Sequence, residues 1–480
     1  MAGRRVDLGL PRRRATKRTS IPALGATLSE SNVEQPSAQQ ASTGAMPRAI
    51  VQRNITLKAI NQFFVETGMT LSQPSMVLTL FVKALGGSNL LVGLVPSIRF
   101  FGWLAPQFLA AGSMQRFTRF MPVVTVLEII RAAFYIIMAV LTYFYGVDHP
   151  ELVLAAFFVL FTITRVTAGS SAVGRTEIIA RMVPPEERAR VVAICNLAGG
   201  VAGFLAGLAV RAILDGRVSQ FPMNYTALIG LSGLSFAISI PVLNGIKEQI
   251  LPIKPRRIDM WQQIRRAPSL LRQDRRYALY VGVRAASTGV ELATPFYILY
   301  ATGVLGAPPA MAGIYVALQT FARVLSNPFW GMQCTKRGDL WVMRSGIACH
   351  LIAAVGVLLL PRLLILISGE AVPSWAASLF GLVFLVEGLG ASAGSIGNIS
   401  YLYSIAPERD RPTYYGLANT LLGPLYFLPA LSGALLDLVG YAPIFAVAAS
   451  SLALAFGLAS RLSAHRDTCQ ACSTPGVSTE

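Results

Sequence analysis

Charged residues are scarce in this sequence of 480 residues. They make up 13% of the chain, whereas a soluble protein of this length carries roughly 25%. So little charge excludes a water-facing globule, because 54% of the residues are hydrophobic and the mean hydropathy is +0.55. Several apolar runs reach the roughly 20 residues that cross a bilayer core. They include residues 120–145, 152–173, 227–246 and 374–396. The composition therefore predicts an all-α polytopic membrane protein.

Cysteine is also sparse, with five residues scattered along the chain. This number and spacing exclude a disulfide framework. Cys469 and Cys472 form a lone C-x-x-C in the C-terminal tail, where only His465 is nearby, and zinc needs more ligands than that. We expect reduced thiols in the tail, no metal site and no cofactor.

The first fifty residues lack a long apolar run, which argues against a secretory signal. They are rich in Ser, Thr, Gln, Ala and Arg and predict a disordered tail. Their Arg and Ser content also fits a transit peptide, against which the acidic Glu30 and Glu34 count. The chain has no P-loop, no H-E-x-x-H and no G-x-S-x-G motif. We therefore expect neither an ATP-driven pump nor an enzyme, and no catalytic residues.

The net charge of +18 is concentrated in two segments, residues 4–18 and 254–276. Basic segments beside apolar spans mark the cytoplasmic side, and they also contact anionic lipid head groups. Most loops on the opposite side of the membrane lack Lys and Arg. The exceptions are Lys83, Arg211, Arg217 and Arg362. No base-reading motif accompanies the charge, so we expect no nucleic acid partner. The pattern predicts an integral protein of the plasma (inner) membrane with both termini in the cytoplasm.

Twelve spans can be read from the hydropathy pattern, each with boundaries good to a few residues. An even number of spans agrees with both termini lying on the same side of the membrane. The spans are approximately residues 55–82, 89–112, 120–145, 151–178, 190–213, 224–246, 277–302, 310–332, 341–366, 374–402, 413–435 and 441–461.

The two halves of the chain are related by an internal repeat. Gly93 matches Gly313 at an offset of 313 − 93 = 220, and Asn196 matches Asn419 at 419 − 196 = 223. Between them, Pro106 matches Pro328 at an offset of 222. A slowly drifting offset is what a duplicated six-span unit with small insertions gives. Six is even, so the repeat is parallel, with its axis along the membrane normal.

This organisation resembles the major facilitator superfamily, which has two six-helix bundles, a basic central loop and both termini inside. The resemblance covers roughly residues 54 to 462. It implies alternating access at a site between the bundles. The predicted divisions are a basic tail, a first bundle, a central loop, a second bundle and a second tail. They comprise residues 1–53, 54–246, 247–276, 277–462 and 463–480.

The family's signature loop between the second and third helices of each half is only partly present. In the second half, Gly331, Lys336 and Gly338 keep its glycines and a basic residue, and we expect them to form a gating loop. Thr335 stands where the family has Asp, and the first-half loop after Gly112 is more degenerate. A charge latch of the usual kind is therefore in doubt.

The fourth span carries Arg165-x-x-x-Gly169, which resembles a family motif whose Arg faces the central cavity. The repeat places Glu387 at the equivalent position of the second half, since 387 − 165 = 222. The two side chains either pair with each other or bind ligand groups of opposite sign. The fifth span has glycines at four-residue spacing from Gly199, which predicts close helix packing, and lacks the Gly-Pro typical of drug antiporters.

Charged residues inside spans cost about 2.5–3.5 kcal/mol each and usually face a cavity or a partner. The resemblance places those of the first, second and fourth helices of each half in the central cavity. The alternative is that an Arg–Glu pair only clamps helices, which we expect of Glu128 with Arg131. Our predicted substrate and coupling residues are Glu66, Arg99, Arg165, Glu291, Arg323 and Glu387, with Asn196 and Asn419.

Burial favours the neutral form of a carboxyl group, so Glu66, Glu291 and Glu387 are candidates for carrying a coupling proton. His350, alone in the ninth span, is interpreted as a packed polar residue rather than a relay. The sequence predicts a monomeric secondary transporter of a small polar or charged solute, with proton coupling as an option. The alternative is a non-transporting relative that acts as a membrane sensor or assembly factor.

Overall fold

The computed structural model describes residues 47–114, 119–216, 220–249, 270–368, 375–407 and 411–462. Residues 46–480 form one compact unit, and every regular element within the described ranges is helical. The all-α prediction is therefore confirmed. The predicted N-terminal tail up to residue 46, most of the central loop and the C-terminal tail lie outside the described residues.

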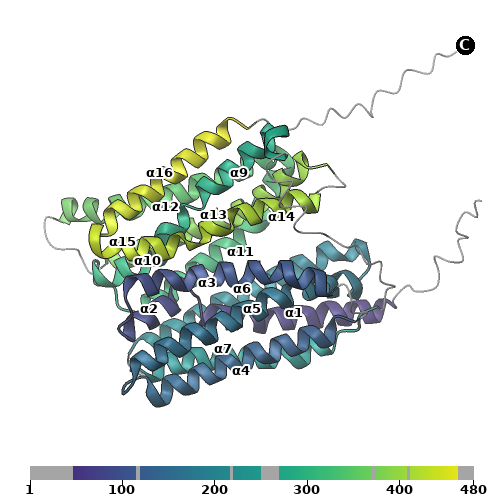
Figure 1. The fold of residues 1–480 in the computed structure, drawn as a ribbon, viewed down its shortest axis with the longest axis horizontal. Helices are drawn as coiled ribbons and strands as arrows, with labels where there is room; N and C mark the ends of the chain where they lie inside the picture. Colours follow the sequence, from purple (N-terminus) through teal and green to yellow (C-terminus); the bar gives the residue numbers. More distant parts are fainter. Residues whose placement is uncertain are drawn as a thin grey trace, which may run out of the picture. The chain divides into compact units, whose positions relative to one another are not determined.

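The helices of the N-terminal half follow the first six predicted spans (Figure 1). The first of these spans is divided into two helices. The elements are α1 (Arg48–Leu71), α2 (Val77–Ala84), α3 (Asn89–Met114), α4 (Met121–Tyr145), α5 (Pro150–Met182), α6 (Arg188–Leu214) and α7 (Met223–Asn244).

The C-terminal half repeats this order, and its first span is again divided. The eleventh span is divided too, because Pro424 lacks an amide hydrogen and the chain passes through a short 3₁₀ turn. The elements are α9 (Arg275–Ser287), α10 (Val290–Gly303), α11 (Met311–Arg337), α12 (Asp339–Ser368), α13 (Ala376–Ile405), α14 (Arg411–Leu422), η2 (Gly423–Phe427), α15 (Leu428–Val439) and α16 (Tyr441–Ser460).

Within the described ranges, eight helical stretches are long and apolar enough to cross a membrane. The four predicted spans that fall short of this measure are the first and second of each half. These four are α1 with α2, α3, α9 with α10, and α11. The first span of each half contains a break, α11 carries Arg323, Lys336 and Arg337, and α3 counts as a shorter apolar helix over Asn89–Leu104. The structure is thus consistent with twelve spans.

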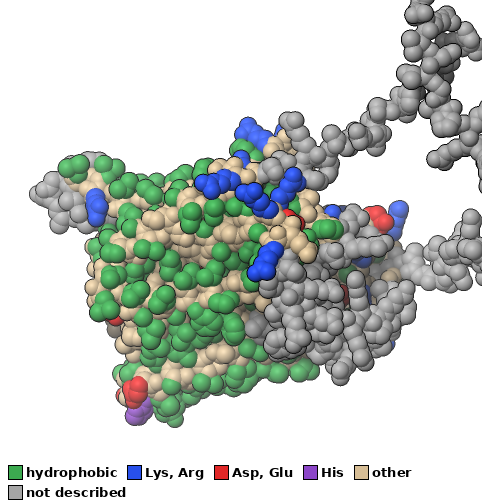
Figure 2. Space-filling view, turned by 45° about the horizontal axis from the view of Figure 1, so that its top comes forward, with side chains coloured by type: hydrophobic (Ala, Val, Ile, Leu, Met, Phe, Trp, Pro, Cys, Tyr) green, Lys and Arg blue, Asp and Glu red, His purple; other side chains and the backbone are tan. Residues whose placement is uncertain are grey.

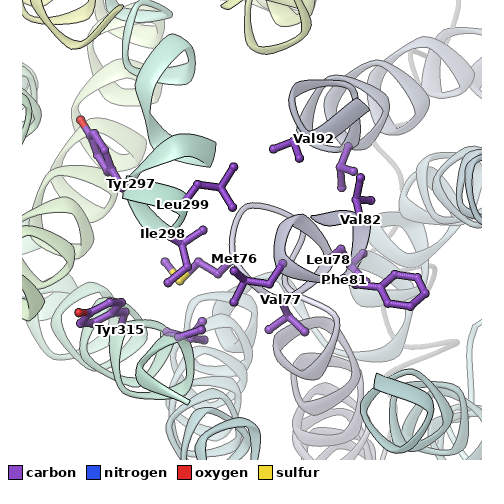
Figure 3. Close-up of a cluster of buried hydrophobic side chains, with 14 of the residues drawn as sticks. Met76, Val77, Leu78, Phe81, Val82, Val92, Tyr297, Ile298, Leu299 and Tyr315 are labelled. Atoms are coloured by element: carbon purple, nitrogen blue, oxygen red, sulfur yellow. The ribbon is translucent and has the colours of Figure 1, made fainter. Parts of the chain in front are cut away.

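The apolar core is continuous at one end of the helices and divided at the other. A single large cluster joins α2 and α3 to α10 and α11, and Figure 3 shows Met76, just before α2, beside Ile298 of α10. Toward the end where α1 begins and α16 ends, the core separates into one cluster in the first half of the chain and two in the second. The two bundles therefore share a core at one end only.

Glycines allow the bundles to touch at the joined end. A Cβ atom on Gly93 of α3 would lie 1.9 Å from the Pro429 carbonyl oxygen of α15. Its repeat partner Gly313 of α11 would place a Cβ 2.2 Å from the backbone nitrogen of Arg211 on α6. Gly207 of α6 likewise lies against Ala317 of α11. We call these two contacts, α3 with α15 and α6 with α11, the glycine seams.

The surface separates apolar from basic residues. Figure 2 shows a wide hydrophobic and uncharged face, with Lys and Arg side chains gathered mainly toward one end. Leu325, Leu366 and Leu438 are between 66% and 81% exposed, which suits contact with lipid rather than water. Together with the eight apolar helices, this surface identifies an integral membrane protein.

Candidate functional site

Two adjoining cavities, of about 460 and 620 Å³, lie between helices of the two halves. Arg99, Arg165 and Arg284 line both, so the cavities form one continuous space. The first is lined mainly by residues near the middle of the helices. The second continues past Lys58 of α1 and Val191 of α6, toward the end where the core is divided. The space is therefore closed by the shared core on one side and continues between the separate cores on the other.

The residues predicted for the cavity do lie along it. The six charged residues line the first cavity. The two asparagines, which the repeat relates to each other, line the second. Their contribution to binding or coupling remains a prediction, because placement by itself shows no ligand.

In each half, the charged residue of the fourth span is held by a residue of the third. Arg165 of α5 donates a hydrogen bond of 2.7 Å to the Tyr135 hydroxyl of α4. Glu387 of α13 contacts Nδ1 of His350 on α12 at 2.9 Å. Arg165 and Glu387 occupy equivalent positions of the repeat, and both are buried, at 6% and 3% exposure. Arg165 and Glu387 do not pair with each other. The direct pair, which was one of the two arrangements that the sequence left open, is therefore not found.

Tyr135 and His350 are two residues whose importance the sequence did not reveal. We interpreted His350 as a packed polar residue, yet it lines the cavity and forms an ion pair with Glu387 when protonated. The repeat gave part of this information, because both residues lie in the third span of their half and the charged residue that each contacts lies in the fourth. Spacing within one helix could not show it, because the partners come from different helices.

A further ion pair crosses between the halves. Arg323 of α11 contacts a carboxylate oxygen of Glu66 on α1 at 2.9 Å. The Arg323 side chain is 45% exposed and that of Glu66 17% exposed, so both border the open space. Gly199 of α6 faces Glu66 and Gln62, which brings the glycine-rich helix to the same region. This pair links the two bundles at the cavity wall.

Three guanidinium groups of the cavity have neutral partners instead. Besides its bond to Tyr135, Arg165 lies 5.0 Å from the centre of the Phe161 ring. Arg284 lies close to the phenols of Tyr280 and Tyr426. The Arg99 guanidinium lies 5.1 Å from the centre of the Phe100 ring. Arg284 was not among our predicted site residues, although it lies seven positions before Glu291, a spacing that in an unbroken helix puts two residues on one face.

A separate buried network lies within the first bundle. Glu128 of α4 pairs with Arg131, accepts a hydrogen bond of 2.8 Å from Ser171 and contacts Arg175 of α5 at 3.3 Å. The Glu128 and Arg131 side chains are 3% and 2% exposed. This arrangement agrees with the clamping role that we assigned to Glu128 and Arg131, and it extends the clamp to a second helix.

The predicted gating loop is mostly helical. Helix α11 continues through Gly331 and Lys336 to Arg337, so neither residue lies in a turn. Only Gly338 has the turn conformation that we expected of the glycines, with φ +89°, a value that strongly favours glycine. Asp339 then begins α12, where its side chain accepts a hydrogen bond from the Leu340 amide. The role of this segment in gating remains a prediction.

These features define a class of protein: a polytopic α-helical membrane protein with a charged cavity between two repeated bundles. Residues 279–468 match the family model of the Major Facilitator Superfamily. No curated protein matches the sequence significantly. The family match in the C-terminal half, together with the fold, confirms the resemblance that the repeat predicted.

Solved structures with the same fold include several transporters. The nucleoside transporter NupG shares 12% identity and a TM-score of 0.63, with 86% of this chain and 99% of that one covered. An auto-inhibited peptide transporter of the POT family shares 15% identity at TM-score 0.64, covering 87% and 98%. A bacterial homologue of the iron transporter ferroportin shares 14% identity at TM-score 0.60, covering 86% and 98%. At such identities the likeness establishes the fold.

Proposed function

We propose that this protein is a secondary transporter that moves a small polar or charged solute by alternating access. One observation carries the proposal: a charged cavity lies between two repeated bundles, closed by a shared core at one end and continued between separate cores at the other. Such a space exchanges solute with one side at a time if the bundles rock about it. The transporters of the same fold, which include nucleoside, peptide and iron transporters, support the general activity and leave the solute open.

The glycine seams are the parts that must separate during transport. Asn89 at the start of α3 hydrogen-bonds Asp437 of α15 across one seam, and both side chains are accessible. A cysteine pair at these positions forms a removable lock. We propose to introduce Asn89→Cys and Asp437→Cys together in a variant that lacks the five native cysteines.

Oxidation of this double variant is expected to abolish exchange of solute in proteoliposomes, and reduction is expected to restore it. Each single cysteine variant is the matched control and keeps its activity under oxidation. Full exchange by a quantitatively cross-linked protein would refute alternating access at this seam. The cross-link can be formed without a known solute, while a thermal-stability screen of metabolites identifies the solute for the exchange assay.

Proton coupling is the finer part of the proposal. Glu387 with His350, and Glu291 on the neighbouring wall, are the groups through which we expect a proton to be carried. A Glu387→Gln variant should keep solute exchange and lose accumulation driven by a pH gradient. Accumulation that persists in this variant, with Glu291→Gln also active, would exclude these carboxyl groups as carriers.

The protein is further proposed to act as a monomer in the plasma (inner) membrane, with both termini in the cytoplasm. The clustering of Lys and Arg at one end supports this orientation through the positive-inside rule. Labelling of a single cysteine near either end in intact cells tests the orientation. The accessibility of an Arg48→Cys residue from outside the cell would reverse it.

A further inference from the structure

The charges of the cavity do not balance among themselves. Its first part is lined by four arginines and three glutamates, together with His350. Two of the glutamates are engaged, Glu66 with Arg323 and Glu387 with His350. Among the described residues, the second part adds Lys58 and Arg175 and is lined by no acidic side chain. The remaining carboxylate is Glu291, against three guanidinium groups that have neutral partners.

Those three guanidinium groups are Arg99, Arg165 and Arg284, and each is positioned by aromatic side chains. A phenol accepts a hydrogen bond from Arg165, phenols lie close to Arg284, and rings lie beside Arg99 and Arg165. Outside this group, Arg131, Arg175 and Arg323 contact carboxylates. Phenols and rings orient a guanidinium without neutralising it, which leaves its positive charge available to a ligand.

A second observation points to a missing partner. Within the described part of the chain, nothing accepts a hydrogen bond from Nε of Arg165, which is buried on a side chain that is only 6% exposed. Arg99, Arg165 and Glu291 line the same cavity, so the cationic groups and the remaining carboxylate share one region. A guanidinium fork matches the two oxygen atoms of a carboxylate or phosphate.

From this arrangement we infer that the cavity binds a solute bearing a carboxylate or phosphate group, held by Arg99, Arg165 and Arg284. This inference rests on the proposed transport function and specifies its substrate class. Glu291 lies on the wall of the same space, where it suits an amino group if the solute has one. Electrostatic attraction by the net positive cavity also draws such solutes in from the end where the core is divided.

Binding to the purified protein tests the inference, in neutral detergent without added anionic lipid, so that a lipid head group is not the source of the anion. The anionic probes are inorganic phosphate, glycerol 3-phosphate, succinate and L-glutamate. Glucose, uridine and choline are the neutral and cationic probes. We expect binding by at least one anionic probe, with its Kd raised tenfold or more in Arg165→Gln, Arg284→Gln and Arg99→Gln.

Matched variants separate direct contact from general charge. Arg53→Gln removes one positive charge from an exposed side chain outside the cavity and should change the Kd less than twofold. Arg165→Lys keeps the charge but loses the fork, and an intermediate Kd is expected. Glu291→Gln should weaken L-glutamate more than succinate if the amino group binds there. Circular dichroism of each variant checks that it is folded.

The outcomes separate this inference from the transport proposal. Anion binding that depends on the three arginines, without exchange in proteoliposomes, keeps the site and rejects transport. Exchange of only neutral or cationic solutes keeps transport and rejects the anion site. Binding of the anionic probes with an unchanged Kd in all three arginine variants overturns the inference, as does the absence of binding by every anionic probe.

Discussion

Two clusters of buried charge in this protein differ in how completely their members are paired. Around Glu128, a carboxylate contacts Arg131 and Arg175 and accepts a hydrogen bond from Ser171, all within the first bundle. In the central cavity, three arginines have neutral partners, and the ion pair between Arg323 and Glu66, which crosses between the bundles, is partly exposed. A paired cluster inside one bundle holds helices together. Charges that border a cavity remain free to exchange partners when the bundles move or a solute enters.

Replacing Glu128 should produce the largest loss of stability. Glu128→Gln leaves the buried Arg131 without its counter-charge, and removal of one partner of a buried pair costs about 3–5 kcal/mol. Thermal unfolding in detergent measures the loss. Glu151→Gln is the control, since its side chain is 78% exposed and its substitution should change stability by about 0.5 kcal/mol or less. Equal stability of the two variants would remove the distinction between the clusters.

The joined end should be the next most sensitive region. In Gly93→Ala the added methyl group meets the Pro429 carbonyl, which should destabilise the closed seam by about 1–3 kcal/mol. Solute exchange should fall at least tenfold, because the cavity then lacks a tightly closed end. Gly457→Ala, whose Cβ would have nothing within 4 Å, is the matched control and should retain activity. Wild-type exchange by Gly93→Ala would show that close contact at this seam is dispensable.

The His350–Glu387 pair should have a smaller effect on stability and a large one on transport. A double-mutant cycle with His350→Gln and Glu387→Gln should give a coupling energy of about 0.5–3 kcal/mol, as expected of residues in contact. Both single variants should lose gradient-driven accumulation. A coupling energy near zero would mean that the contact between His350 and Glu387 contributes nothing to the stability of the folded protein.

Exchange of charges between Glu66 and Arg323 should have the smallest effect on stability. The pair is partly exposed, and such pairs contribute about 0.2–1 kcal/mol. Glu66→Arg or Arg323→Glu alone should impair exchange, and the two together should restore part of it. If the double variant is as impaired as the worse single variant, the pair acts through something other than its mutual attraction.

Much of the fold could be predicted because hydropathy and repetition are properties of the chain itself. The described helices follow the twelve predicted spans, and Gly93 and Gly313, matched by the repeat, both lie at glycine seams. The continuation of α11 through Gly331 was not foreseen, since a glycine and a basic residue are equally compatible with a helix end and with a loop.

The sequence predicted which charged residues line the cavity, but not which residues they contact. A charge within an apolar span signals a cavity or a partner, which is why Arg165 and Glu387 could be selected from the sequence. Their actual partners, Tyr135 and His350, come from neighbouring helices. No spacing along one helix encodes such a contact.

The sequence by itself determined the membrane-spanning, duplicated architecture, because apolar runs must be surrounded by lipid and a duplicated unit repeats its pattern. Only the tertiary structure decided which charges are neutralised. Pairing depends on the packing of α4 on α5 and of α12 on α13, on the contact of α1 with α11 through Glu66 and Arg323, and on which end of the bundles shares a core. That packing left Arg99, Arg165 and Arg284 with neutral partners, and it thereby set the chemistry of the cavity.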